Sequence, residues 1–208
     1  MKKILLLIAA AFLFGIVSCE KDPLGNETDE GRSALELYWD EDYSGRLGIQ
    51  IAGGDTPYMT LAGKPLYVTG VNCYNLFNQS VNASMSVSDM EETVRVFVEQ
   101  KVPVVRFNCN IYHKNELASY YFGKKEQYFA NLTRLAQLCD EAHILLIPSV
   151  FWQIATLPEY YSEALEAWGN TESETYKFML NYTAEVVNLL KGHKCIAAWE
   201  FGNEFNLA

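Results

Sequence analysis

The stretch Cys195-Ile-Ala-Ala-Trp-Glu-Phe-Gly-Asn-Glu-Phe-Asn206 decides the fold of this 208-residue chain. Most of its side chains up to Phe201 are apolar, as in a strand that is covered on both faces. The polar pair Asn203-Glu204 follows almost directly. We therefore expect a buried strand at residues 196–201 with polar side chains just beyond its carboxyl end.

Three earlier segments repeat this pattern, at residues 66–73, 102–108 and 143–151. Each is an apolar run, and polar residues lie at or just past its end. These residues are Asn72, Asn75, Arg106, Asn108 and Gln153. Because the carboxyl ends of parallel strands meet at one edge of a sheet, we expect these side chains to gather there.

Helical periodicity separates the strands, at residues 88–100, 126–142 and 174–191, with a shorter helix at 158–168. Capping boxes at Ser88…Glu91 and Thr171…Glu174 are expected to begin two of these helices. Gly192 stands where a left-handed glycine cap would end the last one.

Alternation of apolar strands with helices predicts a parallel α/β sheet, either doubly wound or a (β/α)₈ barrel. The first strand is not followed by a G-x-G-x-x-G turn, which disfavours a dinucleotide-binding fold. Polar residues at every strand end favour the TIM barrel. Such a barrel needs about 250 residues, so we expect an α/β barrel truncated after about four βα units. Residues 47–52 and 57–61 predict a small β-hairpin before it.

The first residues have the pattern of an export signal. Lys2 and Lys3 precede an apolar run at residues 4–14, and Ile16-Val17-Ser18-Cys19 resembles the lipobox of bacterial lipoproteins. We expect a signal peptide at 1–18, lipidation of Cys19, and a polar tether at 19–44. The protein would then be anchored to the bacterial outer membrane by lipid and exposed at the cell surface. The alternative is an ordinary secretory signal with an incidental cysteine.

The composition excludes some partners. The formal net charge is -10, which disfavours nucleic acid or anionic lipid as a partner because both need clustered Lys and Arg. Aromatic residues make up 13% of the chain, which suits either sugar binding or a large core. Four cysteines lie in or beside predicted strands or on a helix face, without metal-ligand spacing, and are expected to be free core thiols: Cys73, Cys109, Cys139 and Cys195. The alternative is disulfide pairing, which export would permit.

Three motifs resemble, in order and spacing, those of clan A glycoside hydrolases. They are Leu61-Ala-Gly-Lys-Pro-Leu-Tyr-Val-Thr-Gly-Val-Asn72, Val105-Arg-Phe107 and Trp199-Glu-Phe-Gly-Asn-Glu204. The closest resemblance is to glycoside hydrolase family 5, the cellulases and endo-mannanases, and it covers residues 45–208. It implies that this segment is the N-terminal half of a glycoside hydrolase TIM barrel.

The resemblance implies roles for three residues. Glu204 would be the general acid/base, and Asn203 would bind the sugar 2-hydroxyl. The pair also suits an ordinary helix start. Arg106 would hold the nucleophile carboxylate ionised, and an Arg in an apolar strand needs an acidic partner. The alternative is a structural ion pair with Glu200 or Glu204.

Aromatic and polar rim residues are further candidates for substrate binding. Trp152 falls where related enzymes stack an aromatic ring on a sugar, and Tyr74 and His113 are also placed at the rim. Each could equally be structural, and His143 is expected to be structural.

The resemblance implies a retaining glycoside hydrolase acting on β-linked polysaccharide such as β-mannan or β-glucan, and this chemistry needs no metal or organic cofactor. The family nucleophile belongs to a seventh strand, so the chain by itself is expected to be an inactive fragment. Phe205-Asn206 replaces the proline that often follows Asn-Glu, which leaves the choice of polysaccharide open. The alternative is a non-catalytic surface glycan-binding lipoprotein.

Overall fold

The computed structural model describes residues 33–40, 48–51, 57–110, 113–203 and 205. The chain divides into two compact units, Met1–Leu66 and Tyr67–Ala208. The predicted signal peptide and Cys19 lie outside the described residues, and so does Glu204. Within the described ranges, no helix combines the length and the apolar character needed to span a membrane.

The first unit contains a short helix and a small antiparallel sheet. Helix α2 (Ala34–Tyr38) begins at a capping box in which the Ser33 hydroxyl accepts from the Glu36 amide. Strands β1 (Gly48–Ile51), β2 (Pro57–Leu61) and β3 (Lys64–Pro65) pair in that order, which confirms the predicted hairpin. Ala62 and Gly63 turn the chain between β2 and β3 with φ of 54° and 73°, as a two-residue hairpin turn of type I′ requires.

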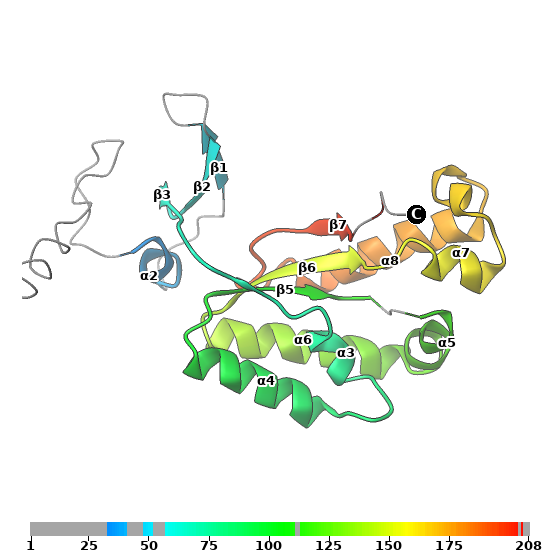
Figure 1. The fold of residues 1–208 in the computed structure, drawn as a ribbon, viewed down its shortest axis with the longest axis horizontal. Helices are drawn as coiled ribbons and strands as arrows, with labels where there is room; N and C mark the ends of the chain where they lie inside the picture. The colour runs from blue at the N-terminus through cyan, green and yellow to red at the C-terminus, as the bar shows by residue number, and fades with distance from the viewer. Residues whose placement is uncertain (1–32, 41–47, 52–56, 111–112, 204, 206–208) are drawn as a thin grey trace, which may run out of the picture. The chain divides into compact units, whose positions relative to one another are not determined.

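The second unit is built on a parallel four-stranded sheet (Figure 1). Its order is β4 (Val71–Asn72), β5 (Val104–Asn108), β6 (Leu145–Phe151) and β7 (Glu200–Gly202). The register pairs Asn72 with Arg106, and Ser149 with Glu200. The predicted parallel α/β sheet is therefore confirmed, and the polar strand ends lie on neighbouring strands.

The two outer strands are shorter than predicted. β4 has two residues instead of the expected 66–73, and β7 begins four residues later than expected, with one isolated bridge between Leu146 and Ile196 before it. Gly70 passes so close to β5 that a Cβ there would lie 2.9 Å from the Val104 carbonyl oxygen. A glycine at this point therefore allows the chain to enter the sheet.

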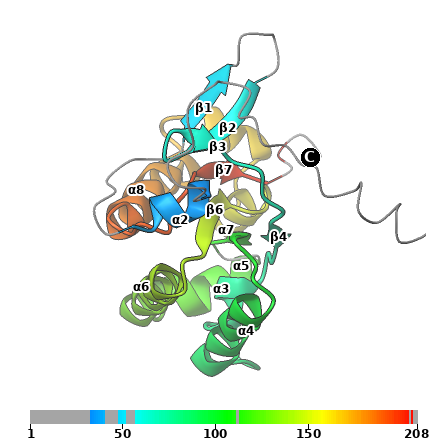
Figure 2. The same cartoon turned by 90° about the vertical axis from the view of Figure 1, so that its left-hand side faces the viewer.

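Helices follow the strands in the predicted alternation. α4 (Val87–Glu99), α6 (Lys125–Glu141) and α8 (Glu174–Leu190) are the long ones, and α4 packs beside α6, which packs beside α8 (Figures 1 and 2). Shorter elements are α3 (Leu76–Gln79), α5 (Lys114–Glu116), a π-helical segment (Leu117–Phe122), α7 (Thr156–Tyr161) and a 3₁₀ segment (Leu165–Gly169). The sequence pattern did not predict α3, α5 or the π-helical segment.

Amphipathic spacing explains the long helices. The residues of α6 that the core buries recur at intervals of three and four: Tyr128, Asn131, Leu132, Leu135, Ala136 and Cys139. This interval places them on one stripe of a helix with 3.6 residues per turn. The stripe faces the sheet, so the period of the sequence decides which side of the helix is buried.

The helix ends differ from the predicted caps. α4 begins at a capping box of Ser86 and Asp89, two residues before the predicted one. Helix α8 ends at Leu190 with Lys191 as its C-cap, and among the described glycines only Gly63 has a positive φ, so Gly192 is not a left-handed cap. The start of α4 was predicted wrongly because Ser86 and Ser88 both lie three residues before an acidic residue.

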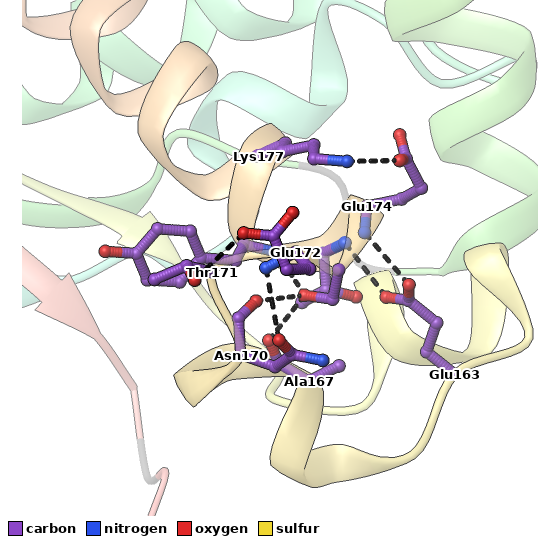
Figure 3. Close-up of polar contacts among 10 residues, drawn as sticks. Glu163, Ala167, Asn170, Thr171, Glu172, Glu174 and Lys177 are labelled. Atoms are coloured by element: carbon purple, nitrogen blue, oxygen red, sulfur yellow. Dashed lines mark hydrogen bonds and ion pairs between the residues drawn. The ribbon is translucent and has the colours of Figure 1, made fainter.

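The start of α8 is capped from outside the helix (Figure 3). Ser173, not Thr171, is the N-cap, and its hydroxyl oxygen accepts from the Tyr176 amide at 3.0 Å. The Glu163 carboxylate accepts from the backbone amides of Glu174 and Thr175, both at 2.9 Å. A carboxylate at this end also interacts favourably with the helix dipole.

A buried aromatic core joins the sheet to α6 and α8. The hydroxyls of Tyr128 and Tyr182 lie 2.8 Å apart, and both donate to the carbonyl of Cys109, just past β5. Burial raises the pKa of both phenols well above 10. We call these three groups the tyrosine network.

The four predicted core cysteines are free thiols. Cys109, Cys139 and Cys195 are buried, and Cys73 is half-buried. Burial raises the pKa of all four thiols and to about 12 for Cys139, so they remain protonated at neutral pH.

Candidate active site

Arg106 is the centre of the polar strand ends. It lies on β5 between Val105 and Phe107, which are fully buried on the other face of the sheet. The Arg106 side chain retains 24% of its exposure. An arginine in this position is costly unless its donors are satisfied.

The guanidinium of Arg106 binds three side chains that come from the two edge strands of the sheet, from β4 and from β7 and the residue after it. Nε donates to Glu200 Oε2 at 2.9 Å, and Nη2 lies 2.6 Å from the same oxygen. Nη2 also donates to Asn203 Oδ1 at 2.8 Å, and Nη1 donates to Asn72 Oδ1 at 3.1 Å. We call Asn72, Arg106, Glu200 and Asn203 the arginine network.

Among the residues that the structure describes, one acid pairs with Arg106. The expectation of an acidic partner is confirmed, and the partner is Glu200 on β7, as the structural ion-pair alternative proposes. Glu200 retains 33% exposure of its side chain, so water still reaches the pair. A pair of this kind orients its neighbours even where its net contribution to stability is small.

Two aromatic rings lie against the network. The Arg106 guanidinium carbon is 4.6 Å from the centroid of the Trp152 ring. Tyr74 stacks on Trp152 with centroids 5.8 Å apart and planes 30° apart. Tyr74 is 49% exposed, so the pair presents an accessible aromatic surface beside Arg106. We call Tyr74 and Trp152 the aromatic platform.

His113 precedes α5 and lines a cavity of about 280 Å³, which we call the α5–α7 cavity. The cavity is lined by His113, Lys114, Asn115, Gln153, Thr156 and Glu159. The structure therefore brings Arg106, Asn203, Trp152 and Tyr74 together, and it places His113 in the lining of the α5–α7 cavity.

The residues around Glu204 are held in place. The Asn203 amide donates to the Phe151 carbonyl at 2.9 Å, which continues the sheet past β7. Phe205 packs its ring against Trp168 at 5.1 Å. A Cβ at Gly202 would approach that ring to 2.7 Å, so glycine is required there for the ring to pack. Glu204 itself lies outside the described residues.

The sequence pattern indicates no catalytic or substrate-binding role for two members of the arginine network, although it predicts Asn72 at the strand ends and Glu200 as a possible partner of Arg106. Asn72 ends the first strand and Glu200 lies inside the last motif, and both bind the guanidinium of Arg106. Their polar character in apolar runs is the signal that marks them. Within the described ranges, no three His, Cys, Asp or Glu side chains are placed to hold a metal ion.

No protein-family model matches the sequence, and no curated protein matches it. Solved structures do match the fold. The endo-1,4-beta-mannanase from Rhizomucor miehei superposes with a TM-score of 0.53 at 17% identity, over 75% of this chain and 48% of the enzyme. This chain has the fold of half a (β/α)₈ barrel.

A second solved structure is similar in the same way. A mutant of the glycoside hydrolase family 5 mannosidase from Rhizomucor miehei superposes with a TM-score of 0.50 at 16% identity, over 71% of this chain and 46% of the mannosidase. The chain thus spans about half the length of each barrel that it matches. At these identities the likeness establishes the fold alone. We refer to residues 67–208 as the half-barrel.

Proposed function

We propose that the half-barrel carries the acid/base side of a retaining glycoside hydrolase site, with β-1,4-mannan as the favoured β-linked polysaccharide. The observation that carries this proposal is the arginine network, in which Arg106 binds Asn203 at 2.8 Å at the carboxyl ends of the strands. Active sites of barrels are built at this end of the strands. The structural relation to a mannanase and a mannosidase favours mannan over glucan.

Glu204 has the role of general acid/base in this proposal. It directly follows Asn203, whose backbone amide donates to the Phe151 carbonyl. A protonated Glu204 would donate to the glycosidic oxygen as the bond to the leaving group breaks. The resulting carboxylate would then take a proton from the attacking water.

The other carboxylate of the reaction is the nucleophile, which the resemblance assigns to a seventh strand. In retaining enzymes the two carboxyl groups stand about 5–5.5 Å apart. Arg106 and Glu200 would support such a site by holding Asn203 in one rotamer, so that its amide meets the sugar 2-hydroxyl. The chemistry requires neither a metal nor an organic cofactor.

The aromatic platform supplies a surface for the sugar ring. Half-exposed Tyr74, supported by Trp152, suits the apolar face of a pyranose. The acidic chain, with its net charge of -10, suits a neutral glycan rather than an anionic polymer.

The test is hydrolysis of β-1,4-mannan by the protein from the whole reading frame, compared with its Glu204→Gln variant. We expect the variant to lose about a hundredfold or more of kcat, since general acid–base catalysis contributes this much, and to retain oligosaccharide binding. The matched control is Glu141→Gln, an exposed residue at the end of α6. Unchanged hydrolysis by Glu204→Gln would overturn the proposal.

Residues 1–208 alone are expected to bind mannan without hydrolysing it. In the family that the sequence resembles, the nucleophile lies on the seventh strand of the barrel, and the residues that the structure describes form four strands of a parallel sheet. The alternative function is a non-catalytic glycan-binding lipoprotein, which the exposed aromatic platform also suits. Glycan binding that is unaffected by Glu204→Ala, with no hydrolysis by the whole reading frame, would favour this alternative. Clear turnover by residues 1–208 would contradict the assignment of the nucleophile.

We further propose export and lipid anchoring at Cys19, based on the Ile16-Val17-Ser18-Cys19 pattern. Metabolic labelling with a radioactive fatty acid should label the wild-type protein, and Cys19→Ser should abolish the label. Equal labelling of both proteins would contradict lipidation at this residue. Processing of the Cys19→Ser variant at the same site would instead indicate an ordinary secretory signal.

A further inference from the structure

Two polar side chains, Asn108 and Ser149, are fully buried near the carboxyl ends of neighbouring strands. The register of β5 and β6 pairs them directly. Side chains alternate between the two faces of a strand, so Asn108 lies on the same face of the sheet as Arg106. Adjacent strands are about 4.7–4.9 Å apart, which places the two polar groups side by side in a region closed to solvent. Each polar atom there costs free energy unless it is hydrogen-bonded.

The side-chain amide of Asn108 is held in one orientation. Its Oδ1 accepts from the backbone amide of Asn110 at 2.9 Å. Because only the oxygen of a side-chain amide accepts a hydrogen bond, this contact identifies Nδ2 as the other end. Nδ2 is buried, and among the described residues it has no acceptor. Nearly all buried donors in native proteins have a partner, so this donor indicates a bound group beside Asn108.

The hydroxyl of Ser149 is only weakly bonded. Its Oγ donates to the Phe151 carbonyl at 3.5 Å, whereas O–H···O bonds are usually about 2.7–2.8 Å long. The same oxygen has lone pairs that accept hydrogen bonds. Ser149 is therefore able to accept from one neighbour and to donate its proton to another.

The next strand supplies an acceptor for the Ser149 proton. Ser149 pairs in register with Glu200 on β7, so polar side chains occupy matched positions on three adjacent strands. Both contacts from the Arg106 guanidinium go to Oε2 of Glu200. A small turn of the Ser149 or Glu200 side chain would bring the hydroxyl to the other oxygen, Oε1. A hydroxyl makes a stronger bond to a carboxylate than to a neutral carbonyl.

A single water molecule suits the space between Asn108 and Ser149. Two hydrogen bonds of about 2.8–3.0 Å each bridge polar atoms on strands with this separation. Water accepts from Nδ2 and donates to Ser149 Oγ, and buried waters characteristically bond to groups that the protein leaves unsatisfied. The Nδ2 donor disfavours a cation at this position, and the nearby Glu200 carboxylate disfavours an anion.

We propose that Asn108 and Ser149 bind one buried water molecule, and that this water completes a chain of hydrogen bonds from Asn108 through Ser149 to Glu200. Every donor in the chain points toward the carboxylate, so each bond polarises and strengthens the next. Asn108 and Ser149 are then positioning residues, which act on the arginine network through Glu200. The proposal goes beyond the proposed function, because it concerns the support of Glu200 and not the sugar.

The first experiment detects the water in the full 208-residue chain. In NMR spectra, the side-chain amide protons of Asn108 should show a nuclear Overhauser effect to a long-lived water molecule. A high-resolution crystal structure should show a water within hydrogen-bonding distance of both Asn108 Nδ2 and Ser149 Oγ. Direct donation from Nδ2 to a protein group, with no water beside it, would overturn the proposal. Neither measurement depends on the folding of a variant.

The second experiment tests the effect on the arginine network. Ser149→Ala should abolish the water signal at Asn108 and shift the Nε–H resonance of Arg106, because Glu200 loses a donor. Ser149→Thr, which keeps the hydroxyl, should retain both signals. The matched control is Ser80→Ala, which removes another buried hydroxyl that donates to a backbone carbonyl. This control should leave both signals in place.

The outcomes separate this proposal from the proposed function. If the wild type shows no water at Asn108, the water site is overturned. If the water is present but Ser149→Ala leaves the Arg106 resonance unchanged, the positioning role is overturned. Neither result bears on the proposed function, which is decided by the hydrolysis that the Glu204→Gln variant retains.

Discussion

The arginine network and the tyrosine network are attached to the same strand, a few residues apart, and they differ in charge and exposure. The tyrosine network is neutral and fully buried, with Tyr128 1% and Tyr182 0% exposed. The arginine network is charged, and its central side chain keeps 24% exposure. Because the tyrosine network is closed to water, it acts as a structural support. The arginine network is open to water, so its polar groups are also available to a ligand.

The difference in burial and charge shows how a single strand, β5, can contribute to both stability and function. A buried neutral pair costs little to desolvate once both hydroxyls find acceptors. A half-exposed ion pair contributes little net stability but orients several side chains at once. We therefore expect mutations in the two networks to separate, with stability lost in the first and sugar binding lost in the second.

The largest effect is expected from Tyr182→Ala. Removing a fully buried aromatic side chain leaves a cavity and should lower the free energy of unfolding by about 3–5 kcal/mol. Urea denaturation followed by tryptophan fluorescence measures this. Tyr182→Phe, which keeps the ring and loses only the hydrogen bond, should cost about 1 kcal/mol. Equal losses in the two variants would contradict the assignment of the effect to packing.

The next effect is expected from Arg106→Leu. It leaves Glu200 partly buried without its partner and should cost about 1–3 kcal/mol, less than for a fully buried pair. The double variant Arg106→Leu/Glu200→Leu should recover part of that loss. Arg95→Leu is the matched control, since Arg95 pairs with Glu92 and Glu99 at an exposed site and should cost at most about 1 kcal/mol.

Oligosaccharide binding sharpens the same comparison. Arg106→Leu should abolish mannohexaose binding while Tyr182→Phe leaves it unchanged, because only the first side chain holds Asn203. Loss of binding in both variants, at a temperature where both are folded, would mean that the two networks are not functionally separate.

A smaller effect is expected at alkaline pH from Tyr121, which lies in the π-helical segment and packs its ring against Tyr128 and Tyr182 of the tyrosine network. Burial, followed by its hydrogen bond to Glu185, raises the pKa of Tyr121 from 10.0 to about 12. The unfolded chain releases this proton first, so stability is full below pH 10 and falls as the pH rises from 10 to 12. Tyr121→Phe should make the unfolding midpoint less sensitive to pH in that window.

The smallest effect is expected at acid pH from Glu163, the carboxylate that caps α8 (Figure 3). The backbone amide of Thr175 is the main cause that lowers the pKa of Glu163 below 4.5. Its contribution to stability is therefore present above pH 4.5 and is lost as the pH falls through the lowered value. Glu163→Gln should reduce the acid sensitivity of the melting temperature, and Glu166→Gln, a nearby exposed control, should not.

The sequence predicted the site better than it predicted the element limits. Polar residues at the ends of apolar runs indicated that Asn72, Arg106 and Asn203 would meet, and they do. Strand limits were less accurate, since β7 runs over Glu200–Gly202 instead of 196–201. An apolar run shows that a segment is buried, and pairing with a neighbouring strand decides how much of it is strand.

The caps show a different limit. Ser86 and Ser88 both lie three residues before an acidic residue, and local pattern does not separate them. Glu163 caps α8 from eleven residues away. A local sequence pattern does not predict the contact between Glu163 and the start of α8, because it depends on how the chain folds back after α7.

What the sequence by itself determined is the alternation of buried strands and amphipathic helices, and with it the edge of the sheet where the polar residues gather. This follows because the period of apolar residues sets which face is buried. The tertiary structure alone decided that Arg106 pairs with Glu200, 94 residues away, and that His113 lines the α5–α7 cavity. These choices depend on distances between side chains from different strands and helices, which exist only once the sheet has formed.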